Sequence, residues 1–237
     1  MPLSNQTFES FYMGNAAENK IMSELFFLGY EAFKLNPDIG LDILVTNKAF
    51  SQFHKITQIQ HYLQVKSTFL INGTATFSLT DDDLNFLSNG LDVTTVFCYI
   101  QPIIEATADS YSRGDYEPWR NALEAEGESI FYGSKDFKEL KKTNCLSSLD
   151  FKGFQMGYIW FNSAQLLRAQ EENIFSPWVS DKNVKMQSIT IKLNEISNCI
   201  TINDQSVIPE IRNIYYLLKE SSTKKRLTNG DFLFNHY

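Results

Sequence analysis

The chain is short of the residues on which many common sites are built. Its 237 residues include three histidines and only three cysteines, which are Cys98, Cys145 and Cys199. The cysteines are odd in number, widely spaced and form no C-x-x-C pair, so neither a zinc site nor a disulfide framework is predicted. This usage is typical of a reducing compartment, and we expect a cytoplasmic location.

Long apolar runs and an excess of positive charge are also absent. No apolar stretch approaches the roughly 20 residues that cross a bilayer. Residues 1–11 show no basic segment followed by an apolar one, so we expect neither a membrane span nor a signal peptide. The net charge of −7 argues against broad, tight binding of duplex nucleic acid. It is compatible with an enzyme whose acidic site is neutralised by a metal ion.

The first hundred residues carry a clear pattern of helices and strands, as expected of a globular protein with a sizeable core. Residues 48–58 are predicted to be a polar hairpin loop, and Asn72-Gly73 a turn between strands. Thr80 is predicted to cap a helix. The pattern predicts helices over 7–28 and 81–87, and strands over 30–35, 41–47, 59–68, 74–79 and 93–100.

Beyond residue 100 the pattern is looser. It predicts a loop over 106–114, helices over 116–125, 135–142, 166–172 and 209–219, a strand over 157–161, and a hairpin from 188–193 and 198–202. We therefore expect an α/β fold with a central mixed sheet flanked by helices. Its expected parts are a core over 1–100, an inserted segment over 101–156, and a final part over 157–237. That final part would complete the core and add a C-terminal hairpin-helix extension.

Two apolar strands carry polar groups that an apolar strand does not need. Asp42 opens one strand, where a carboxylate without a partner is unfavourable. Gln64 and Lys66 on the next strand are separated by one residue and so point to the same face. A carboxylate, an amide oxygen and an ammonium on neighbouring strands can hold a divalent metal ion and a water next to a phosphate. This set indicates metal-dependent hydrolysis of phosphodiester bonds.

Three motifs occur in a fixed order: G-x-x-A-E at 14–18, D-x-G-x-D at 38–42 and Q-V-K-S-T at 64–68. Together they resemble the PD-(D/E)XK nuclease superfamily, in its Mrr-like and Holliday-junction-resolvase-like branch. The likeness is closest to a bacterial domain family of unknown function, and residues 77–80 and 83–84 share it. The resemblance covers roughly the first hundred residues, with a weaker similarity at 158–160. It implies a restriction-endonuclease-like core.

The resemblance also implies roles for the strand residues. Asp42 matches the main metal carboxylate, and Gln64 stands where many relatives have Glu, so that its side-chain oxygen is the expected ligand. Lys66 matches the lysine that positions or deprotonates the attacking water and offsets charge on the phosphate. The alternative for Lys66 is a side chain that merely reaches solvent at an edge strand. The implied cofactor is Mg²⁺ or Mn²⁺.

Two further acids are candidates for the same site. Glu18, on the first helix, matches the additional acid that some branches use to hold metal or water, although acids are routine on amphipathic helices. Asp38 is a candidate metal ligand, but it also lies in Asn-Pro-Asp-Ile-Gly, which is ordinary turn chemistry. Glu24 is the fallback acid.

The sequence thus predicts a metal-dependent nuclease that acts on nucleic acid, with DNA favoured over RNA. Bacterial restriction or phage defence is implied by the resemblance alone. A homodimer is an option because double-strand cutting needs two sites. Two alternatives stay open. One is a nuclease subunit that is inactive until a protein partner or second messenger binds, which the acidic charge favours. The other is a non-catalytic binding module, which Gln64 favours because it removes one negative charge.

Overall fold

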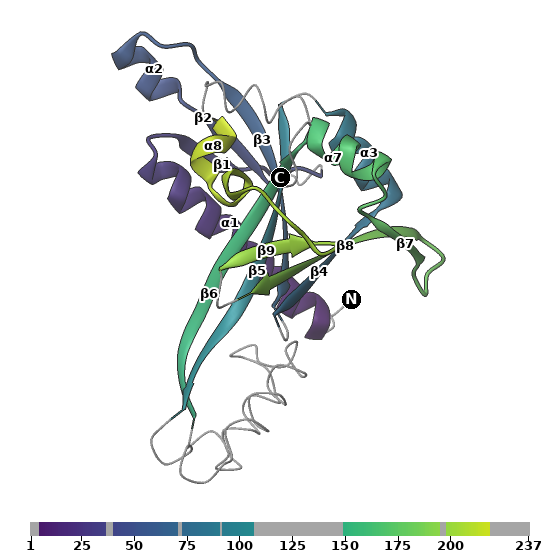
Figure 1. The fold of residues 1–237 in the computed structure, drawn as a ribbon. Coiled ribbons are helices and arrows are strands. Elements are labelled where there is room, and N and C mark those ends of the chain that lie inside the picture. The colour runs from purple at the N-terminus through teal and green to yellow at the C-terminus, as the bar shows by residue number, and fades with distance from the viewer. Residues whose placement is uncertain are drawn as a thin grey trace.

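The computed structural model describes residues 5–36, 40–70, 73–90, 92–106, 149–194 and 198–218. It has an α/β fold with two sheets, one mixed and one antiparallel, and helices flanking them (Figure 1). In the part of the chain that these ranges cover, no helix is both long enough and apolar enough to span a bilayer.

The mixed sheet, sheet A, has a parallel pair at its centre. β3 and β5 run parallel and are joined through β4 and a helix, whereas the other neighbours are antiparallel. Residues 93–100 of β5 are all buried, as their mostly apolar sequence predicts for a central strand. The strand order in sheet A is β1 (Glu31–Lys34), β2 (Ile43–Thr46), β3 (Gln60–Phe69), β5 (Val93–Ala106) and β6 (Leu149–Asn162).

The second sheet, sheet B, brings together strands from both halves of the chain. Its order is β10 (Gln205–Ser206), β9 (Cys199–Ile202), β8 (Lys185–Asn194) and β4 (Thr74–Thr80), and β7 (Ser176–Val179) also pairs with β8. The predicted hairpin of β8 and β9 is confirmed. Because β8 also pairs with β4 along the whole of β4, this hairpin shares a sheet with a strand from the first hundred residues.

The two strands on either side of the predicted Asn72-Gly73 turn, β3 and β4, belong to different sheets. Gly73 does take the positive φ of a turn, +70°, but the chain leaves it in the direction of sheet B. The backbone oxygen of Gly73 accepts a hydrogen bond from the Leu193 N–H at 2.7 Å. A partner 120 positions along the chain therefore decides where β4 goes. Asn72 lies outside the described residues.

Four of the predicted helices are present, three of them as continuous helices and one interrupted. α1 (Asn5–Phe27) buries residues spaced by four, namely Ala17, Ile21 and Leu25, and its end leads into Gly29 at φ +84°. α3 (Asp81–Asn89) is capped by Thr80, whose Oγ1 accepts from the Asp83 N–H at 2.9 Å. α7 (Ser163–Glu171) begins at a capping box formed by Asn162 and Gln165. The fourth, over 209–219, is interrupted.

The C-terminal helix divides into η3 (Pro209–Arg212) and α8 (Ile214–Leu218). Asn213 between them is extended, with φ −132° and ψ 115°. Its carbonyl oxygen accepts from Nε1 of the buried Trp160 at 3.1 Å. The same oxygen also accepts from the Tyr216 N–H at 3.1 Å, so a tertiary hydrogen bond and a local one meet at the residue where the helix is interrupted.

The loop predicted over 48–58 contains a helix instead, α2 (Lys48–His54). Its first N–H groups, of Lys48 and Ala49, donate to the Glu31 carboxylate at 3.1 and 2.9 Å. Glu31 lies on β1, 17 positions earlier. Local sequence carries no signal of so distant a residue, so the helix was missed, whereas the antiparallel pairing of β2 with β3 confirms that the segment connects a hairpin.

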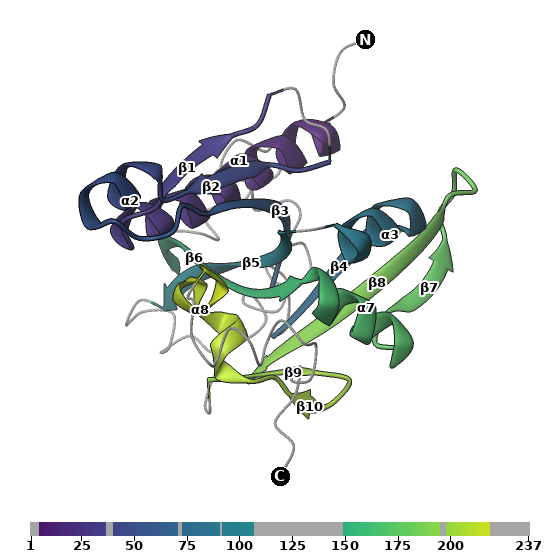
Figure 2. The ribbon, with the colours of Figure 1, turned by 90° about the horizontal axis from the view of Figure 1, so that it is seen from above.

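The register of sheet A gives its two faces different partners. Leu63 and Val65 of β3 point toward α1, whereas Gln64 and Lys66 point to the opposite face. On that opposite face Phe97 of β5 packs against Phe77 of sheet B, with ring centroids 5.1 Å apart. Figure 2 shows α1 on one side of sheet A and sheet B on the other. Sheet A is therefore the middle layer.

Two adjacent threonines on β5 differ in whether the side-chain hydroxyl is hydrogen-bonded, and this difference can be tested. Both are buried, but Thr94 Oγ1 lies 2.9 Å from His61 Nε2, whereas Thr95 Oγ1 has no hydrogen-bond partner in the described part of the chain. We expect Thr95→Val to raise the free energy of unfolding by about 1 kcal/mol, because it removes an unsatisfied buried hydroxyl. Urea unfolding at neutral pH measures this change.

Thr94→Val is the matched control. It should lower the free energy of unfolding by about 1 kcal/mol, because it removes the hydrogen bond between the Thr94 hydroxyl and the imidazole of His61. Equal destabilisation by both substitutions would contradict the assignment.

Candidate functional site

The carboxylate of Asp42 is held by the neighbouring strand. Its Oδ2 accepts from the backbone N–H of Val65 at 2.6 Å and from Nε2 of Gln64 at 2.7 Å. The backbone of Asp42 is bonded on both sides, to Leu63 at 2.9 Å and to Leu35 at 2.8 Å. Because strand pairing fixes the Val65 N–H, the position of the carboxylate is fixed as well. This bonding explains how an acid is accommodated beside an apolar strand.

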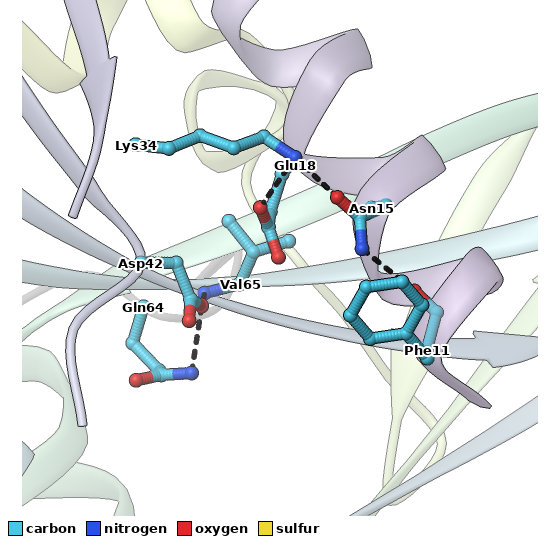
Figure 3. A network of polar contacts seen from close by, with 7 residues as sticks. All are labelled: Phe11, Asn15, Glu18, Lys34, Asp42, Gln64 and Val65. Atoms are coloured by element: carbon cyan, nitrogen blue, oxygen red, sulfur yellow. Dashed lines mark hydrogen bonds and ion pairs between the residues drawn. The ribbon is translucent and has the colours of Figure 1, made fainter. Parts of the chain in front are cut away.

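Gln64 is buried and turns the nitrogen of its amide toward Asp42. Figure 3 shows its oxygen directed away from that carboxylate. Rotating the amide by half a turn exchanges nitrogen and oxygen with little change of shape. The oxygen would then face the same point as the Asp42 carboxylate, an arrangement that a cation between them favours and that is repulsive without one. The structure therefore brings the two predicted ligands, Asp42 and Gln64, into contact through a hydrogen bond from the amide nitrogen.

Glu18 approaches the same region from α1. Its carboxylate forms an ion pair with Lys34 of β1 at 2.9 Å, and Lys34 also donates to Asn15 Oδ1 at 2.6 Å. Asn15 in turn donates to the Phe11 carbonyl oxygen at 3.0 Å. In Figure 3 the Glu18 carboxylate points toward Asp42. The structure thus brings Glu18 to the same end of sheet A as Asp42.

Lys34 is a cation of this region that sequence reasoning missed. It occupies the last position of β1 and pairs in register with Ile43, the residue after Asp42. Its signal in the sequence is weak, because a lysine at the end of an edge strand is commonplace. Antiparallel pairing of β1 with β2 places it next to the register position of Asp42, and its ammonium pairs with the Glu18 carboxylate.

Lys66 lies two residues beyond Gln64 on β3 and shares its face of the sheet. The side chain is half-buried, and no hydrogen bond or ion pair joins it to the residues that the structure describes. An ammonium in this setting is available to an anion from solution. The structure gives no contact between Lys66 and Asp42, so the pair that touches is Asp42 and Gln64.

Asp38 lies outside the described residues, and its predicted role as a metal ligand stays a prediction. Glu24, the fallback acid, is engaged elsewhere. It forms an ion pair with Lys20 at 2.6 Å and accepts from the hydroxyl of Tyr158 on β6. That hydroxyl also accepts from the Ile214 N–H at 3.2 Å. Burial, and then the bond to Glu24, raises the pKa of Tyr158. Glu24 therefore joins α1 to β6 and α8 as a structural residue.

The buried Cys98 next to this group is unsuited to nucleophilic chemistry. It lies on β5, on the α1 side of sheet A. Burial raises the pKa of its thiol to about 12, so the reactive thiolate is essentially absent at neutral pH.

The donors around Asp42 suit one class of metal ion. Carboxylate and amide oxygens are hard ligands, and Mg²⁺ commonly uses one or two protein carboxylates together with waters and substrate phosphates. Among the described residues, no group of three or more His, Cys, Asp or Glu side chains is placed to hold a metal ion. The described residues around Asp42 therefore do not form a closed structural metal site, and Mg²⁺ or Mn²⁺ stays a prediction.

Comparison of this chain with protein-family models, with curated proteins and with solved structures finds no match.

Proposed function

We propose that the protein is a metal-dependent nuclease that hydrolyses nucleic-acid phosphodiester bonds at Asp42, Gln64 and Lys66. The observation that carries this proposal is the anchored carboxylate of Asp42. It is bonded to Gln64 on the strand that also bears Lys66, whose ammonium has no hydrogen bond or ion pair among the described residues. The proposal includes a restriction-endonuclease-like core made of α1 and sheet A. The order of a helix, strands and a parallel β3–β5 crossover through α3 supports it.

Each residue has a distinct part in this proposal. Asp42, with Gln64 after its amide rotates, would hold Mg²⁺ or Mn²⁺, which when bound polarises a phosphate oxygen and acidifies water. Lys66 would orient the attacking water or take its proton, and would offset charge that builds on the phosphate. Glu18 would hold a water of the metal through its carboxylate, with its orientation set by Lys34.

Charge in the site is close to balanced, which bears on how the metal is held. Asp42 and Glu18 carry two negative charges. Lys34, which pairs with Glu18, and Lys66, on the face of β3 opposite to α1, carry two positive ones. A balanced site attracts a divalent cation weakly, and the phosphate of a bound substrate would supply the missing negative charge. Metal and nucleic acid would therefore bind cooperatively. The preference for DNA as the substrate rests on the resemblance alone. The proposed role in restriction or phage defence has the same basis.

One observation favours a second candidate, a non-catalytic nucleic-acid-binding or protein-binding module. The side-chain amide of Gln64 donates to the Asp42 carboxylate at 2.7 Å, so a hydrogen bond within the chain already holds this carboxylate. A subunit that becomes active only with a protein partner or second messenger would show the same resting geometry.

The Lys66 side chain provides the first test of activity. We expect wild type to cut plasmid or single-stranded DNA or RNA with Mg²⁺ or Mn²⁺ and not with EDTA. Lys66→Ala should lower the rate by about 100-fold or more, because it removes the group that acts on water and phosphate.

Lys192→Ala is the matched control for that experiment. Lys192 is a strand lysine of sheet B that pairs with Asp204 at 2.9 Å, and its loss should leave cleavage unchanged. An unaltered rate in Lys66→Ala would contradict the proposed role. No cutting by wild type on any substrate would favour the activated-subunit or binding-module alternatives.

Gln64→Glu tests the proposed metal ligands by a gain of function. The substitution adds a carboxylate beside Asp42, so without metal it should lower the free energy of unfolding by about 1–2 kcal/mol. It should also raise Mg²⁺ affinity by about tenfold or more, because the added charge attracts the cation. Calorimetric titration with Mg²⁺ and urea unfolding with and without Mg²⁺ measure both effects.

Asp42→Asn is the companion variant, and it should abolish the heat of Mg²⁺ binding. If neither wild type nor Gln64→Glu binds Mg²⁺ or Mn²⁺, the metal-dependent mechanism is wrong and the binding module is favoured.

A further inference from the structure

Large apolar side chains gather in solvent at one end of the molecule, where α1 ends and α2 lies. Phe27 is 91% exposed and Phe53 is 82% exposed, and the other members are about half exposed. We call this surface the apolar end. Its members are Phe26, Phe27, Leu28, Phe50, Phe53 and Ile56.

The two segments that form the apolar end lie side by side. A Cβ added at Gly29, directly after α1, would lie 3.9 Å from the Phe50 ring of α2. The Glu31 carboxylate, two residues further on, accepts from the first N–H groups of α2. Figures 1 and 2 both show α2 beside the C-terminal end of α1. The six exposed side chains therefore come from two segments that meet at Gly29 and Phe50.

α2 obtains little of its stability from packing inside its own chain. It has seven residues, and none of them is buried. A helix this short is marginal in water, and helices in proteins are stabilised chiefly by burying an apolar face. The stacking of Phe50 on His54, with ring centroids 4.1 Å apart, is local to the helix. The apolar face of α2 thus lacks a covering element among the residues that the structure describes.

The size of the apolar end suits a specific interface. At roughly 200 Å² for a fully exposed Phe, the six side chains expose on the order of 700 Å². The largest apolar patch of a typical monomer is about 300–600 Å². A standard interface buries about 800 Å² on each partner. The patch is therefore larger than a monomer usually carries and close to what one side of a stable complex requires.

We propose that the apolar end is the contact surface of a homodimer, in which a second copy of the chain packs its own apolar end against it about a two-fold axis. An isologous contact needs a self-complementary surface, and an uncharged apolar patch meets that need. The chain carries a net charge of −7, so two copies repel through most other faces. The charged residues flanking the patch on α2 are Lys48 and Lys55, which lessen that repulsion locally.

The dimer would leave the Asp42 region uncovered. Asp42 directly precedes β2 and α2 follows it, so the two features lie at opposite ends of this strand. The dimer would thus present two separate Asp42 regions to solvent. The inference does not rest on the proposed nuclease activity, because its test measures only association.

Sedimentation velocity over protein concentrations from below to well above micromolar tests the homodimer. Wild type should sediment as a monomer–dimer equilibrium with a micromolar or lower dissociation constant. Phe27→Ser and Phe53→Ser should each raise that constant by about 100-fold or more, because each substitution occurs twice in a two-fold interface. Trp178→Ser removes an exposed aromatic residue from β7 and should leave the constant unchanged.

Far-UV circular dichroism of the two Phe variants provides the folding control. Since both side chains are mostly exposed, the variants should keep the wild-type spectrum, so that loss of the dimer reports on the surface. A wild-type monomer at every concentration overturns the inference. So does a dimer whose dissociation constant neither Phe variant changes, or a monomer that uses the apolar end to bind anionic phospholipid vesicles.

Discussion

The hydrogen bond from the Val65 N–H to the Asp42 carboxylate is the contact on which the candidate site depends. It ties the residue that opens β2 to the middle of β3 at 2.6 Å. The same carboxylate receives Gln64, so one oxygen atom sets the position of both predicted ligands. Register then places Lys66 on the same face of β3 as Gln64. A backbone donor in a paired strand cannot move away, so the site is held by the sheet rather than by flexible side chains.

The middle position of sheet A is the second constraint. α1 covers one face and carries Glu18 to the end of the sheet at which β2 begins. The other face packs on sheet B through Phe97 and Phe77. Both layers must be in place for the site to form, because its groups come from α1, β1, β3 and the residue before β2. The pairing of β4 with β8 makes the two halves of the chain interdependent, since neither half completes sheet B alone.

Neither the candidate site nor the apolar end is needed to fill the hydrophobic core. The buried side chains run without interruption through α1, sheet A and sheet B. Burying polar groups near Asp42 costs free energy, and so does exposing the aromatic residues of α2 to water. The hydrophobic core needs neither feature. Features of this kind are where a protein binds other molecules. Their places at opposite ends of β2 let one surface associate while the other stays accessible.

Local patterns in the sequence determined much of this protein. The four-residue spacing of apolar side chains predicted α1, Thr80 predicted the start of α3, and the strand pattern predicted β5 and the β8–β9 hairpin. An acid in an apolar strand marked Asp42, and alternation placed Gln64 and Lys66 on one face. The tertiary structure alone decided the pairing of β4 with β8, the helix α2, the break at Asn213 and the position of Lys34 beside Glu18. Three of these involve a partner far along the chain: Leu193 for Gly73, Glu31 for α2, and Trp160 for Asn213. Lys34 is placed by the pairing of β1 with the next strand, β2. Local propensity acts over a few residues, so it carries no information about contacts that only the folded chain creates.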